Sequence, residues 1–110
     1  MNIAAISTPH GLGGIAVIRV SGPDAIAIVD TYFRPFNPNH RLAGRKSHTL
    51  TFGQFEDIDE VVCSLYRAPH SFTGEDVVEI SCHGSLYIQK QILERLTTAD
   101  SATSNSLPRE

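Results

Sequence analysis

Two charged residues interrupt apolar segments that otherwise have the pattern of buried strands. Arg19 lies in the segment IAVIRV at 15–20, and Glu79 lies in VVEIS at 77–81. Such charges are costly to bury unless they are paired or face a ligand cleft. If the two strands are neighbours, a structural salt bridge is one interpretation. Recognition of a flat polar heterocycle is the other, because a carboxylate accepts two N–H bonds and a guanidinium offers a planar donor fork.

A glycine-rich loop precedes the strand that holds Arg19. Gly11, Gly13 and Gly14 permit tight backbone geometry, and such loops can expose N–H groups to an anion or a flat ligand. The loop leads into a strand and not a helix, and the sequence G-x-x-x-x-G-K-[ST] occurs nowhere in the chain. We therefore expect no nucleoside-triphosphate site here, and both a plain turn and a binding loop remain open.

The segment PHSFTGED at 69–76 is a second loop with chemical groups. It carries an aromatic ring at Phe72, hydroxyls at Ser71 and Thr73, a glycine and two carboxylates. A surface turn capped by Ser71 or Thr73 and a ligand-binding loop are both compatible with this composition.

The neighbours Cys82 and His83 raise the possibility of a nucleophile. No acid at a recognisable spacing would orient the histidine, and a cysteine in an apolar strand is usually inert. The remaining histidines lack zinc-ligand spacing. We expect neither a catalytic residue nor a metal site.

The elements that must position these groups follow from hydrophobic patterning. We expect strands at 3–7, 15–20, 48–55, 60–67 and 76–82. A first helix begins near Ser21 or Gly22, with Pro23 at its first position, and runs through Phe33 until Pro35 and Pro38 end it. A second helix spans about 86–96. The prediction is one α+β domain at 1–97, with about five strands in a mixed sheet and two to three helices, and a polar, disordered tail at 98–110.

Composition restricts the class of protein. The chain has 110 residues and a net charge of −3, which argues against binding nucleic acid by charge alone. The only local basic cluster is Arg41, Arg45 and Lys46, and we interpret it as a solvated loop. Because the start lacks a signal-peptide pattern and no apolar run could span a membrane, we expect a soluble, cytoplasmic protein with reduced cysteines.

Two blocks of sequence resemble one known family. The run STPHGLGGIAVIRVSGP at 7–23 resembles the opening of the tRNA modification GTPases (MnmE/TrmE), with its T-P-x-G-x-G-G loop and I-R-[IVL]-S-G strand. The run RAPHSFTGEDVVEISCHG at 67–84 resembles the P-x-S-[FY]-T-G-E-D-x-x-E-x-x-x-H-G signature of that family. The resemblance covers residues 3 to 97.

The resemblance implies a homodimeric domain that binds tetrahydrofolate carrying a one-carbon group, of the 5-formyl or methylene type. Its fold would be similar to the folate domains of the glycine cleavage T-protein group. The family's folate-contacting Arg and Glu fall on Arg19 and Glu79. Gly13, Gly14, Phe72 and Thr73, in the matched motifs, are further cofactor-binding candidates.

Full-length members of that family add a helical domain and a GTPase domain that uses GTP, potassium and magnesium. With the flavoprotein MnmG (GidA) they modify the wobble uridine of certain tRNAs. After Leu96 the chain lacks the family's P-G-E-F-[ST]-x-R-A-F stretch and a basic folate contact expected there. The alternative is therefore a dimerisation or interaction module that has lost ligand binding.

Overall fold

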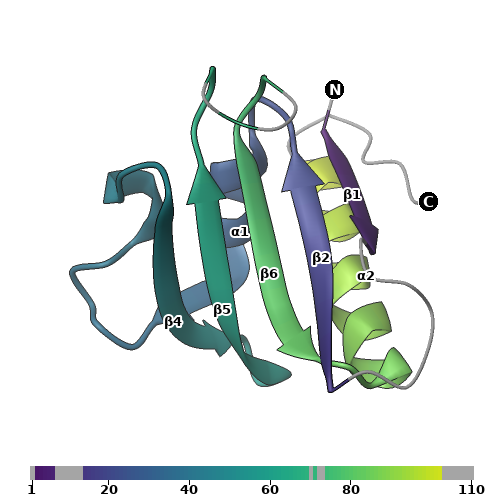
Figure 1. Ribbon diagram of the computed structural model, residues 1–110. Helices are drawn as coiled ribbons and strands as arrows, with labels where there is room; N and C mark the ends of the chain where they lie inside the picture. Colours follow the sequence, from purple (N-terminus) through teal and green to yellow (C-terminus); the bar gives the residue numbers. More distant parts are fainter. Residues whose placement is uncertain (1, 7–13, 70, 72–73, 103–110) are drawn as a thin grey trace.

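The fold is a single antiparallel sheet covered on one face by two helices (Figure 1). The computed structural model describes residues 2–6, 14–69, 71 and 74–102. Its six strands have the order β1-β2-β6-β5-β4-β3, and all neighbouring pairs are antiparallel. The strands are β1 (Ile3–Ile6), β2 (Ile15–Ser21), β3 (Phe33–Pro35), β4 (Thr49–Phe55), β5 (Asp59–Tyr66) and β6 (Val77–His83).

The α+β class and the single domain are confirmed, but two details of the prediction are wrong. The sheet is antiparallel and not mixed, because β6 inserts between β2 and β5 and runs opposite to both. The sixth strand is β3, which was not predicted because Phe33 continues the apolar spacing of the preceding helix. Helix α1 (Ala25–Tyr32) ends one residue earlier, and β3 pairs with the end of β4. Pro35 fits this position because an edge strand does not need every N–H as a donor.

The start of α1 also differs from the prediction. Its N-cap is Asp24, and neither Ser21 nor Gly22 has that role. Asn2 fixes the start of the helix: its Oδ1 accepts the Asp24 N–H at 3.0 Å, and its Nδ2 donates to Asp24 Oδ2 at 3.2 Å. Gly22 turns the chain there with φ of +143°, a conformation that only glycine adopts easily.

The core lies between the sheet and the helices. Along β2, β5 and β6, alternate residues such as Ile18, Leu65 and Ile80 are buried against α1 and α2. The intervening residues point to the other face of the sheet, and none of the described helices covers that face (Figure 1).

Helix α2 (Leu86–Ala102) continues well beyond Leu96, where the sequence pattern predicted its end. Polar composition at 97–98 suggested a tail, but the Thr97 and Thr98 hydroxyls donate to the carbonyls of Leu93 and Glu94 four residues earlier. Small polar side chains can therefore be accommodated in a helix. Residues 98–102, expected to belong to the tail, are thus part of α2, and 103–110 lie outside the described residues.

Candidate functional site

The face of the sheet away from α1 and α2 presents a row of side chains across five strands. We call this side the open face. Directly opposed residues in an antiparallel pair share a face, so the strand register defines one row. That row consists of Ala5, Arg19, Glu79, Ser64 and Leu50, from β1 to β4. The predicted pair Arg19 and Glu79 thus lies at the middle of the open face.

Arg19 and Glu79 form an ion pair. Arg19 Nε and Nη2 donate to the same oxygen, Glu79 Oε2, at 3.2 and 2.9 Å. The side chains are 36% and 23% exposed, so the pair is accessible from the open face. In the described part of the chain no donor contacts the second oxygen, Oε1. The carboxylate therefore retains capacity to accept hydrogen bonds from a ligand.

A shallow hollow lies farther along the same face. Its volume is about 240 Å³, and it is lined by Gly14, Ile15, Glu60, Val62, Ser81, Cys82 and His83. Ser81 lies two residues after Glu79 on β6 and is opposite Val62 of β5, so the hollow adjoins the ion pair. Among the predicted site residues, the structure brings Gly14 to this hollow and not to the ion pair itself.

His83 has an orienting acid that the sequence did not reveal. Its Nδ1 lies 2.7 Å from Asp59 Oδ1, and its backbone N–H donates to Asp59 Oδ2 at 2.8 Å. These residues are distant along the chain and meet only because β5 and β6 are neighbours. Local spacing carried no signal for the contact.

Cys82 is not a partner for His83. It faces the core, opposite to His83 on the same strand, as alternation requires. Burial, and secondarily the charge of Asp59, raises the pKa of the Cys82 thiol from 9.0 to about 11. Since the thiolate is the nucleophilic form, the geometry disfavours covalent chemistry at this position.

The second loop is closed by its own hydrogen bonds. The Ser71 hydroxyl donates to the Glu75 carbonyl, and the Ala68 N–H donates to Asp76 Oδ1 at 2.8 Å. The capped-turn interpretation therefore describes Ser71 well. A second hollow of about 370 Å³ lies beside this loop, lined by Pro23, Ala68, Gly74, Glu75 and Asp76. The remaining candidates, Gly13, Phe72 and Thr73, lie outside the described residues.

Neither a metal cluster nor a membrane span is found among the residues described. No three His, Cys, Asp or Glu side chains converge there as a metal site would require. No described helix combines the length and apolar character needed to cross a bilayer.

Comparison with known proteins settles the family. A family profile described as "GTP-binding protein TrmE N-terminus" matches residues 2–106. The chain belongs to the TrmE family. The matched range extends past residue 97, where the motifs alone placed its end, and so includes the polar segment up to residue 106.

The curated relatives are tRNA modification GTPases named MnmE. The protein of Parabacteroides distasonis is 57% identical over 102 residues, which cover 88% of this chain and 22% of the relative. That of Bacteroides thetaiotaomicron is 52% identical over 98 residues, covering 86% and 21%. That of Flavobacterium johnsoniae is 48% identical over 99 residues, covering 86% and 21%. The chain thus spans about a fifth of the length of these TrmE relatives.

Proposed function

We propose that this chain is the folate-binding and homodimerising N-terminal domain of a tRNA modification GTPase that acts on wobble uridine. The ligand is tetrahydrofolate with a one-carbon group, of the 5-formyl or methylene type. The observation that carries the proposal is the accessible Arg19–Glu79 pair at the middle of the open face, with Glu79 Oε1 uncontacted by any described donor.

The chemistry of a pterin fits this pair. The amino-pyrimidinone edge of the ring presents adjacent N–H donors, which a carboxylate accepts together. Glu79 would accept them, while Arg19 holds the Glu79 side chain in position through its two hydrogen bonds. The adjoining hollow, which includes Gly14 and Ile15, offers apolar surface for more of the ligand. One-carbon chemistry would come from the bound folate.

The rest of the family's activity belongs to sequence outside these 110 residues. GTP, potassium and magnesium would bind in the GTPase domain, since no phosphate-binding G-x-x-x-x-G-K-[ST] sequence is present here. Modification of tRNA would require that domain and the flavoprotein partner MnmG. This chain would supply the folate and the contact between subunits.

Isothermal titration with 5-formyltetrahydrofolate tests ligand binding. We expect the parent chain to bind and Glu79→Gln to bind at least tenfold more weakly, which is about 1.4 kcal/mol. Glu94→Gln is the matched control, because it removes a carboxylate from α2 on the other side of the sheet. Equal affinities in the parent and a folded Glu79→Gln variant would refute the assigned role. Absence of binding by the parent chain would favour the alternative, an interaction module without ligand.

The open face also supports the proposal of a homodimer. Ile15, Leu50 and Phe52 on this face are more than half exposed, and apolar side chains grouped on one face are typical of a protein contact. Sedimentation velocity should show a dimer for the parent and a shift toward monomer for Phe52→Glu. Tyr87→Glu on α2 is the control, because Tyr87 is also more than half exposed but lies on the helical side. A monomeric parent chain at high concentration would contradict dimerisation.

A further inference from the structure

Charge is distributed very unevenly along this acidic chain. Residues 33–55 contain four basic residues, Arg34, Arg41, Arg45 and Lys46, and no Asp or Glu. The rest of the chain contains all 12 Asp and Glu residues but only five Lys and Arg residues. A net charge of −3 therefore conceals a positive segment in an otherwise strongly negative molecule. Such a segment can attract an anion even when the whole protein does not.

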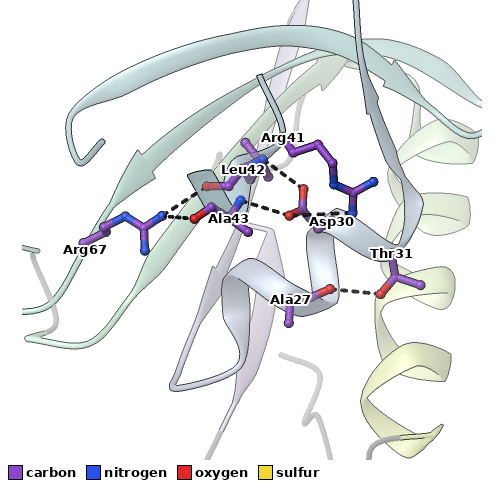
Figure 2. A network of polar contacts seen from close by, with 7 residues as sticks. All are labelled: Ala27, Asp30, Thr31, Arg41, Leu42, Ala43 and Arg67. Atoms are coloured by element: carbon purple, nitrogen blue, oxygen red, sulfur yellow. Dashed lines mark hydrogen bonds and ion pairs between the residues drawn. The ribbon is translucent and has the colours of Figure 1, made fainter. Parts of the chain in front are cut away.

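The connection between β3 and β4, where three of these charges lie, has a fixed structure (Figure 2). It contains a short 3-10 helix, η1 (Leu42–Gly44), whose Leu42 is fully buried. Asp30 of α1 accepts the N–H groups of Leu42 and Ala43 at 3.1 and 3.0 Å. The expected solvated loop is thus held on α1, and the basic residues that flank η1 have defined positions.

Arg67 holds the other end of η1. Its Nη2 donates to the carbonyls of Leu42 and Ala43 at 3.2 and 2.9 Å (Figure 2). Its Nε donates to the Arg45 carbonyl at 2.9 Å. Arg67 lies directly after β5, so it adds a further positive charge to the same corner of the sheet. We call Arg41, Arg45, Lys46 and Arg67 the basic corner.

Most of the charge of the basic corner is not neutralised. Arg45 donates to the Thr51 hydroxyl and the Leu50 carbonyl, and the acceptors of Arg67 are also uncharged carbonyls. Among the described residues the one carboxylate paired with the corner is Asp30, 3.9 Å from an Arg41 side chain that is 64% exposed. Lys46 is exposed. Four cations against one paired carboxylate leave the basic corner with a net positive charge.

We propose that the basic corner binds the sugar–phosphate backbone of an RNA. Guanidinium groups bind phosphate oxygens with matching geometry. Hydrogen bonds already hold the side chains of Arg45 and Arg67, so these two lose little conformational entropy on binding. The negative charge of the remaining chain repels a polyanion and so confines the contact to this corner. The choice of RNA over another polyanion rests on the proposed function in tRNA modification. Contacts to phosphate position the RNA without reading its sequence.

Fluorescence anisotropy with labelled bulk tRNA tests the proposal on the whole chain. Lys46→Gln should weaken binding about fivefold and reduce the slope of log affinity against log salt by about 1, because one phosphate contact is lost. Arg41→Gln combined with Lys46→Gln should reduce the slope by about 2. Lys90→Gln is the matched control, because Lys90 is exposed on α2. Helix α2 lies behind β1 and β2, away from the connection between β3 and β4 (Figure 1).

Three results would overturn the proposal. The first is no binding of tRNA by the parent chain at about 50 mM salt. The second is an equal loss of affinity in Lys46→Gln and Lys90→Gln, which would reflect total charge alone. The third is Lys46-dependent binding to vesicles of phosphatidylcholine and phosphatidylserine without binding to tRNA. Titration of the same variants with 5-formyltetrahydrofolate separates this proposal from the folate site, because Lys46→Gln should leave folate affinity unchanged.

Discussion

Arg19 and Glu79 are direct cross-strand partners on β2 and β6, and Arg19 Nη2 lies 2.9 Å from Glu79 Oε2. Their strands are far apart in sequence but adjacent in the sheet. The pair is accessible and lies on the face without helices. Because both side chains are partly exposed, solvent screens the attraction between them and limits what the pair can contribute to stability.

The first prediction concerns the stability of that pair. Glu79→Gln should lower the free energy of unfolding by less than about 1 kcal/mol, because partly exposed ion pairs are screened by solvent. Urea denaturation measures this difference. A loss above about 2 kcal/mol would instead identify the pair as a structural salt bridge.

The second prediction concerns Gly22. Gly22→Ala should destabilise the protein by about 2 kcal/mol or more, because φ is +143° and a new Cβ would lie 2.1 Å from Asn2 Oδ1. Gly44→Ala is the control, since nothing lies within 4 Å of the position that its new methyl group would occupy. Thermal unfolding gives the melting temperatures of both variants. Similar values would show that neither the positive φ nor the closeness of Asn2 requires glycine at position 22.

The third prediction concerns Asp30. Asp30→Ala should cost about 2–3 kcal/mol, because the N–H groups of Leu42 and Ala43 lose their acceptor. Hydrogen exchange should accelerate at these two amides. Asp57→Ala, at an exposed turn position, should change stability by less than about 0.5 kcal/mol. Unchanged exchange at Leu42 in Asp30→Ala would show that the hydrogen bonds from η1 to Asp30 are not required to hold η1 in place.

The fourth prediction concerns Cys82. Burial raises the pKa of this thiol from 9.0 to about 11, so at a given pH below 9 the native protein holds about a hundredfold less thiolate than the unfolded chain. The stability that this shift contributes is complete below pH 9 and is lost as the pH rises toward 11, because only the unfolded chain then releases the proton readily. Thiol labelling of a Cys63→Ser variant isolates Cys82. Rapid labelling of the native variant near pH 8 would contradict its burial.

Several features of the site could be predicted from the sequence. A charge within an apolar strand is conspicuous, so the sequence alone identifies Arg19 and Glu79 as candidate site residues. Alternation then assigned each to a face. Whether the two charges met depended on the strand order β2-β6-β5, which no local pattern encodes.

The missed features depend on contacts between distant segments. Asp59 orients His83 only through the pairing of β5 with β6. The three residues of β3 are too few for a strand pattern, and Phe33 continued the spacing of the helix. The basic cluster had the composition of a solvated loop, and its fixed position depends on Asp30 and Arg67, which lie outside it.

A crystal structure of the chain with 5-formyltetrahydrofolate tests the central claim most directly. The expected result is a pterin ring on the open face, with its N–H donors about 2.7–3.2 Å from the Glu79 carboxylate. A ligand bound in the hollow beside Pro23 and Asp76, with the Arg19–Glu79 pair untouched, would contradict the claim.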